Sequence, residues 1–168
     1  MRKIFSFYVL MIIAIVGIKA QATYKQTDIL KSYKEAEELV NLGKYAIAQP
    51  LLNDFIQKYE NKTLDKSNNI YADAIYYKAL CEKETASPES EKDLQYFADN
   101  FKGHPKINNA YFHLGDMAFA KANYNDVLAF FDKVDESSLA GKDRAEFQYK
   151  RAFANFALKK FSPARIDR

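Results

Sequence analysis

The sequence predicts an all-α fold, a solenoid of antiparallel helical hairpins. A small residue on one predicted helix is followed nine positions later by an aromatic residue that opens the next, in the pairs Ala36 and Tyr45, Gly115 and Tyr124, and Ala152 and Phe161. Ala79 holds the small position of a less regular unit. Helices that cross closely need a residue without bulk at the contact, and a large ring fills the gap beside it. The repetition therefore indicates a stack of hairpins.

The first hairpin is predicted from residues 30 to 41 and from Tyr45 to about Tyr59, with Gly43-Lys44 between the two helices. Pro50 falls inside the second of these helices. It should either kink that helix or delay its start, because proline removes one backbone hydrogen bond and costs about 3 kcal/mol in a regular helix. The polar stretch from 61 to 69 predicts a loop.

The second hairpin is predicted from Ala72 to Glu84 and from Glu89 to Phe101. Ser87 is expected to cap the second helix, and Pro88 suits the first helical position, where a missing N–H group removes no bond. The third hairpin is predicted over residues 108–122 and 124–134.

The fourth hairpin is predicted to begin at about Asp143 and to turn at Lys159-Lys160, with Ser162-Pro163 opening its last helix. That helix reaches Arg168 after little more than a turn. We therefore expect the natural chain to continue.

Residues 1–22 have the build of a secretory signal peptide. Arg2 and Lys3 precede an apolar run from Ile4 to Ile18, and Ala20-Gln21-Ala22 places small residues before the expected cleavage site. The apolar run is shorter than the roughly 20 residues of a membrane span. The sequence thus predicts an exported domain over residues 23–168, and an uncleaved N-terminal anchor is the alternative.

The charge balance bears on nucleic-acid binding, and the cysteine content bears on disulfide formation. Removal of residues 1–22 lowers the number of Lys and Arg residues from 25 to 22, equal to the 22 Asp and Glu residues. A nearly neutral mature chain gives no electrostatic reason to expect a nucleic-acid partner. Cys81 is the single cysteine, so it cannot form a disulfide within the chain, and its apolar neighbours predict a buried thiol.

The third hairpin resembles the tetratricopeptide repeat in Tyr111, Leu114, Gly115, Ala118, Tyr124, Val127 and Phe131. The resemblance covers residues 30–168 as about three complete units and an incomplete fourth. Successive small residues are 43, 36 and 37 positions apart, longer than the standard repeat of about 34, and the chain has no tryptophan. With its export signal, the chain looks like the envelope repeat proteins of Gram-negative bacteria, among them Tol-associated periplasmic and outer-membrane-assembly proteins.

This resemblance implies a non-enzymatic scaffold that binds a protein or peptide segment on its concave face. The expected location is the periplasm or the periplasmic face of the outer membrane, with possible association with outer-membrane proteins. In the family the first helix of each hairpin lines the concave face, so the candidate peptide-binding residues are the aromatic residues on these helices: Tyr33, Tyr76, Phe112, Phe119, Tyr149 and Phe156.

Two alternatives stand beside this hypothesis. Aromatic residues at helical spacing are more often core, and repeats bury most rings between neighbours. The chain is alternatively the structural opening segment of a longer repeat array or multidomain enzyme, with binding or catalysis beyond Arg168.

The sequence gives little support to catalysis. It lacks a glycine-rich phosphate loop, a nucleophile elbow and a zinc-protease histidine pair. His113 and Asp116 are three residues apart on a helix, but two ligands fall short of a typical transition-metal site. We therefore expect no cofactor, no metal and no small-molecule substrate.

Overall fold

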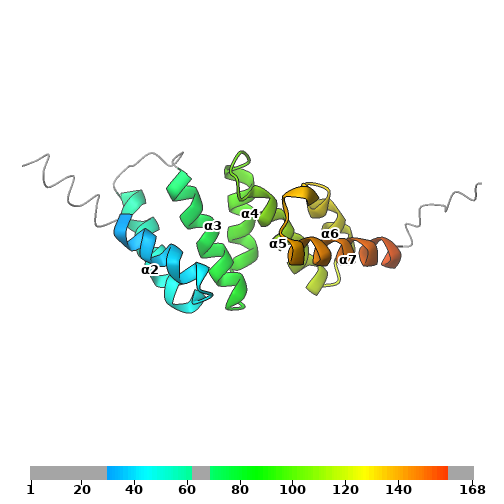
Figure 1. The fold of residues 1–168 in the computed structure, drawn as a ribbon, viewed down its shortest axis with the longest axis horizontal. Coiled ribbons are helices and arrows are strands. Elements are labelled where there is room, and N and C mark those ends of the chain that lie inside the picture. The colour runs from blue at the N-terminus through cyan, green and yellow to red at the C-terminus, as the bar shows by residue number, and fades with distance from the viewer. Residues whose placement is uncertain (1–29, 62–68, 159–168) are drawn as a thin grey trace, which may run out of the picture. The chain divides into compact units, whose positions relative to one another are not determined.

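A computed structural model describes residues 30–61 and 69–158, and every regular element within these ranges is a helix (Figure 1). The all-α prediction is confirmed for this part of the chain. The chain divides into two compact units, Met1–Leu64 and Asp65–Arg168, and each is described by itself. The expected signal peptide and the helix expected after Ser162-Pro163 lie outside the described residues. Of the loop expected over residues 61–69, the two end residues belong to helices and residues 62–68 lie outside the described residues.

The described part of the first unit is a helical hairpin, formed by residues 30–41 and α2 (Tyr45–Asn61). Pro50 lies inside α2, five residues after its first residue, so it does not delay the start of the helix. The two helices meet through buried Ala36 and through the rings of Tyr33 and Phe55, whose centroids are 5.3 Å apart. The small residue thus lies where the helices cross, as predicted.

The second unit contains the remaining helices in chain order: α3 (Asn69–Glu84), α4 (Ser90–Asn100), α5 (Ile107–Ala120), α6 (Tyr124–Phe131), the short 3-10 helix η1 (Glu136–Ser138) and α7 (Gly141–Ala157). Each α-helix from α3 to α6 packs against the next one in the chain, and α5 also contacts α7. Hairpins α3–α4 and α5–α6 are therefore stacked in sequence order, with α7 following.

The start of α4 differs from the prediction. The helix begins at Ser90, with Glu89 at the N-cap and no capping side chain. Ser87 does not cap it, because its Oγ accepts a hydrogen bond from the backbone N–H of Glu89, at 3.4 Å, within the preceding turn. Pro88 accordingly lies in this turn rather than at the first helical position.

The turns that close the first helices share one backbone geometry. Gly43, Ala86 and Ala122 have φ angles of 69°, 56° and 55°, and each lies seven residues after the small residue of its hairpin. In the third hairpin the N–H of Ala122 donates to Phe119 O and the N–H of Asn123 donates to Ala118 O, both at 2.9 Å. This pattern is the Schellman motif, which satisfies the last carbonyl groups of a helix.

The core repeats a contact between aromatic rings within each hairpin. Tyr76 on α3 lies 5.4 Å from Phe97 on α4, and Phe112 on α5 lies 6.1 Å from Phe131 on α6, measured between ring centroids. Phe131 also covers Gly115, where a Cβ atom would overlap the ring. The second helix of a hairpin therefore packs against a small residue and against the aromatic residue three positions before it.

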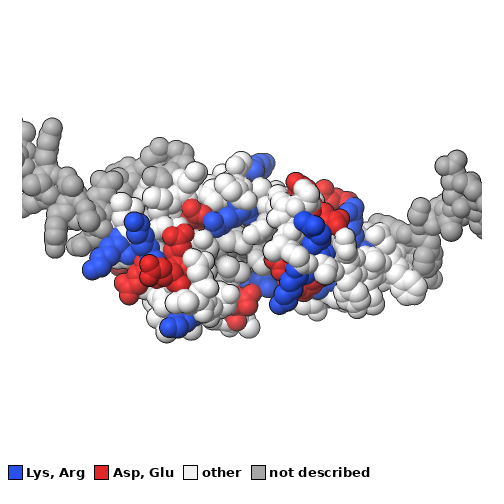
Figure 2. All heavy atoms as spheres, in the orientation of Figure 1, with Lys and Arg blue, Asp and Glu red and all other residues white. Residues whose placement is uncertain are grey.

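Positive and negative side chains are interspersed over the face shown in Figure 2. This mixture agrees with the balanced charge expected for residues 23–168. No helix within residues 30–61 or 69–158 has the length and apolar character needed to span a membrane.

Candidate binding face on the first helices

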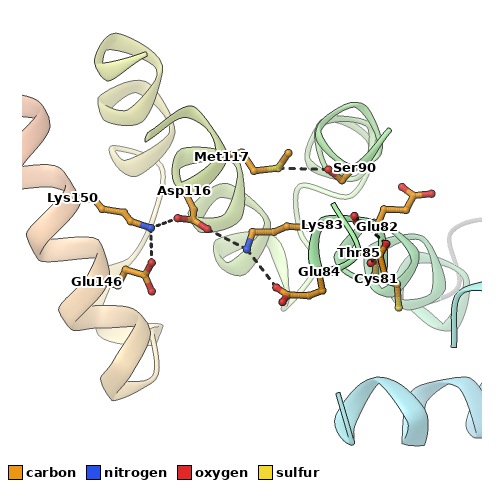
Figure 3. Close-up of polar contacts among 10 residues, drawn as sticks. All are labelled: Cys81, Glu82, Lys83, Glu84, Thr85, Ser90, Asp116, Met117, Glu146 and Lys150. Atoms are coloured by element: carbon orange, nitrogen blue, oxygen red, sulfur yellow. Dashed lines mark hydrogen bonds and ion pairs between the residues drawn. The ribbon is translucent and has the colours of Figure 1, made fainter. Parts of the chain in front are cut away.

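A row of ion pairs links three helices of the second unit, α3, α5 and α7 (Figure 3). Lys83 Nζ on α3 lies 3.1 Å from Asp116 Oδ2 on α5. Lys150 Nζ on α7 donates to the other oxygen of Asp116 and also to Glu146. Asp116 on α5 therefore forms ion pairs with a lysine on α3 and with a lysine on α7.

All three central groups of this row are charged at neutral pH. Burial lowers the pKa of Lys83 and of Lys150, but the hydrogen bonds and negative charges of Asp116 and of the neighbouring glutamates together more than compensate, so both pKa values lie above the ordinary value. Burial raises the pKa of Asp116, and the hydrogen bonds from Lys150 and Lys83 outweigh it, so this pKa lies below the ordinary value. Each charge in the row is thus paired with a charge of opposite sign.

His113 lies on α5 one turn before Asp116, and its ring stacks on Tyr76 with centroids 6.4 Å apart. Burial, assisted by the positive charge of Lys83, lowers its pKa to about 4. Its Nδ1 atom is buried and makes no hydrogen bond. His113 is therefore a neutral, packed histidine at physiological pH.

Aromatic rings gather beside the ion-pair row. Phe119 on α5 contacts Tyr149 and Phe153 on α7, with centroid distances of 6.4 Å and 5.5 Å. The ammonium group of Lys150 lies over the Phe119 ring at 5.5 Å from its centroid, a cation–π geometry. Charged and aromatic groups thus form one continuous surface on α5 and α7.

The predicted peptide-binding residues divide into two sets. Tyr33, Tyr76 and Phe112, three positions before a small residue, are buried with exposed fractions of 6%, 3% and 4%. Phe119 is partly exposed, whereas Tyr149 and Phe156 are 62% and 65% exposed. The three buried rings lie in the core, and the other three reach the surface.

Helices α3, α5 and α7 each have two further positions whose side chains reach solvent. These positions lie one and four residues after the small residue, and their side chains are at least partly exposed. We define the first-helix face by these six residues: Leu80, Lys83, Asp116, Phe119, Phe153 and Phe156. A partner lying across the first helices would meet these side chains.

Sequence reasoning did not find Asp116, Lys150 and Phe153 as parts of one surface. Asp116 and Lys150 are 34 residues apart, so their contact depends on the stacking of α7 on α5. The sequence does contain a signal for this face. The residue directly after each small residue lies on a neighbouring side of the helix, beside the crossing helix rather than under it.

Among the described residues, no group of three or more His, Cys, Asp and Glu side chains is placed to hold a metal ion. No protein-family model matches this sequence, and none of the curated proteins is significantly similar to it. The resemblance to tetratricopeptide repeats therefore rests on the residues of the chain itself.

Proposed function

We propose that this chain is a tetratricopeptide-type scaffold that holds a protein or peptide segment on its first-helix face. The observation that carries the proposal is the exposed aromatic surface of Phe119 and Phe153 beside the compensated charges of Asp116 and Lys150. Exposed rings gain free energy when a partner covers them, at roughly 25 cal/mol per Å² of apolar surface. The neighbouring charges supply hydrogen-bonding groups for a peptide backbone.

The charges of the face suit a peptide of low net charge. Lys83 and Lys150 are already paired with Asp116, and Glu84 and Glu146 lie at the two ends of the row. A strongly charged partner would have to displace these pairs and leave part-buried charges uncompensated. The role is non-enzymatic and uses no cofactor and no nucleic acid.

A photoreactive residue at Phe153 of the full-length gene product tests this function in intact cells. We expect a discrete crosslinked protein, identified by mass spectrometry. The matched control carries the same photoreactive residue at Tyr96, an exposed tyrosine on α4 outside the face. Crosslinking of the same protein at both positions, or of none at Phe153, would rule out the first-helix face as the partner site.

We propose further that the protein acts in the bacterial cell envelope, with residues 1–22 removed on export. The basic and apolar pattern of these residues supports this location. N-terminal sequencing of the protein purified from the envelope fraction should begin at Thr23. A chain that retains Met1 and stays with the membrane would instead indicate the uncleaved anchor.

A second candidate function is the opening segment of a longer repeat array or multidomain enzyme. The observation that favours it is the exposed Ala152, because the corresponding Ala36 and Ala79 are fully buried. Intact-mass measurement of the native protein decides between them. A mass well above the 19.4 kDa of this chain supports the longer array, and a mass at or below that value removes it.

A further inference from the structure

Met117 on α5 is the single methionine of residues 23–168, since Met1 and Met11 both lie in the expected signal peptide. Its side chain lies where α5 packs against α4 and extends toward Ser90, the first residue of α4 (Figure 3). Met117 is partly exposed, whereas Ser90 has an exposed fraction of 1%. Small solutes therefore have access to the methionine but not to the serine.

The Ser90 hydroxyl is a buried donor that faces a weak acceptor. It donates a hydrogen bond to Met117 Sδ, with 3.9 Å between Oγ and Sδ. A thioether sulfur accepts hydrogen bonds weakly, and a buried hydroxyl without a good acceptor costs free energy. A stronger acceptor on the same sulfur would therefore stabilise the contact between α4 and α5.

Oxidation of the sulfur supplies such an acceptor, because a methionine sulfoxide carries a polar oxygen. The 3.9 Å between Ser90 Oγ and Met117 Sδ exceeds the roughly 2.7–2.8 Å of an O–H···O hydrogen bond, so an added oxygen has room between the two atoms. Methionine is unbranched and rotates about several bonds, which lets the sulfoxide turn its oxygen toward the serine.

We propose that Met117 is an oxidation site for peroxides and that Ser90 holds the resulting sulfoxide by donating its hydroxyl to the sulfoxide oxygen. A lone pair of Met117 Sδ attacks one oxygen of hydrogen peroxide, so that an S–O bond forms while the O–O bond breaks. The second oxygen leaves as water with both hydrogen atoms. The sulfur is oxidised and the peroxide is reduced. Methionine sulfoxide reductases return the sulfoxide to the thioether.

The other sulfur of residues 23–168 is protected from the same oxidant. Cys81 is fully buried on α3, and burial, with the negative charge of Glu82, raises its pKa to about 11. Peroxides oxidise the thiolate rather than the neutral thiol, and at neutral pH this thiol stays protonated. Oxidation is therefore directed to Met117.

The serine also explains how the fold survives the modification. A sulfoxide normally disrupts an apolar contact, because it turns an apolar side chain into a polar one. At the contact between α4 and α5 the new oxygen meets a buried donor that already points at the sulfur. Met117 thus consumes oxidant without separating the two helices. This role concerns a modification and does not rest on the proposed function.

Peptide mapping by mass spectrometry, after hydrogen peroxide treatment of the folded full chain, tests the site. Ala129→Met supplies an internal reference, because position 129 on α6 is exposed and both methionines then react in one molecule. Met117 should take up one oxygen atom at a rate within about tenfold of that at position 129. A rate at Met117 that is slower by more than this factor would overturn the proposal.

Urea denaturation before and after peroxide treatment tests the part played by Ser90. Oxidation should lower the urea midpoint of Ser90→Ala by at least about twice as much as that of the unmodified chain, because alanine offers the sulfoxide no donor. Met117→Leu is the control for oxidation elsewhere in the chain, and its midpoint should not respond to peroxide. Equal shifts with and without the Ser90 hydroxyl would show that the serine does not hold the sulfoxide.

Discussion

Gly115 on α5 lies directly beneath the ring of Phe131 on α6, so close that a Cβ atom at position 115 would overlap the ring. The contact fixes the distance between the two helices of the third hairpin. Phe131 is fully buried and is also in contact with Phe147 on α7, with ring centroids 4.6 Å apart. Phe131 therefore contacts both α5, over Gly115, and α7, through Phe147.

Gly115→Ala should destabilise the protein. The added methyl group forces the Phe131 ring to move, and overpacking costs about 1–3 kcal/mol, partly offset by the roughly 1 kcal/mol that alanine gains over glycine in a helix. We expect a net loss of up to about 2 kcal/mol in the free energy of unfolding, measured by urea denaturation. Gly141→Ala is the control, because nothing lies within 4 Å of a Cβ atom there. An equal effect at both positions would contradict the packing argument.

The same steric requirement explains why the hairpins could be predicted from sequence. A close crossing demands a small residue locally, and the structure buries Ala36, Ala79 and Gly115 as predicted. The candidate site was less accessible to prediction. Tyr76 and Phe112 have a residue type and spacing that suit both a binding surface and a core, and only the packing of Phe97 and Phe131 against them decides between the two.

The turns show a second limit of sequence reasoning. The glycine at position 43 indicates a positive φ angle from sequence alone, since glycine adopts this conformation without strain. Ala86 and Ala122 adopt nearly the same angle with no such sequence signal. They take part in the Schellman hydrogen bonds that close the ends of α3 and α5.

Ala122→Gly should therefore stabilise the protein. A left-handed conformation costs a residue with a Cβ atom about 1 kcal/mol relative to glycine. We expect a comparable gain in the free energy of unfolding, visible as a higher urea midpoint at unchanged slope. Ala120→Gly, at the last residue of α5, should lower stability by up to about 1 kcal/mol. Destabilisation by both substitutions would show that the turn is not strained.

Asp116→Asn should weaken the stacking of the hairpins in the second unit. The substitution removes the carboxylate that Lys83 and Lys150 share, leaving two part-buried ammonium groups with weaker partners. We expect a loss of about 1–3 kcal/mol in the free energy of unfolding. Asp132→Asn is the matched control, because the ion pair of Asp132 with Arg151 is largely exposed and should contribute less than about 1 kcal/mol. Similar losses for the two substitutions would remove the special role of Asp116.

His113 should make the protein less stable as the pH falls from 7 to 5. Its pKa is about 4 in the folded chain against 6.5 for an unperturbed histidine, so in this range the unfolded chain takes up a proton that the folded chain does not. Stability is therefore complete above the unfolded pKa and is lost as the pH falls towards the folded one. The difference between pH 7 and pH 5 should be about 2 kcal/mol for this residue.

Urea denaturation of His113→Leu at both pH values provides the test. The variant should lose about 2 kcal/mol less than the unmodified protein between pH 7 and pH 5. The remaining loss includes His104, whose pKa is also lowered, chiefly by burial. An unchanged pH dependence in His113→Leu would show that the pKa of His113 is the same in the folded and the unfolded chain.

Cys81 should be unreactive while the protein is folded. The thiol is fully buried on α3, and burial, with the negative charge of Glu82, raises its pKa to about 11. Because the thiolate is the nucleophile, iodoacetamide at pH 8 should modify Cys81 only after unfolding. Ala129→Cys, which adds an exposed cysteine on α6, should be modified once per chain under the same native conditions. Native modification of Cys81 as fast as that of position 129 would mean that α3 opens readily, and the buried contacts of α3 would then be too weak to hold the stack together.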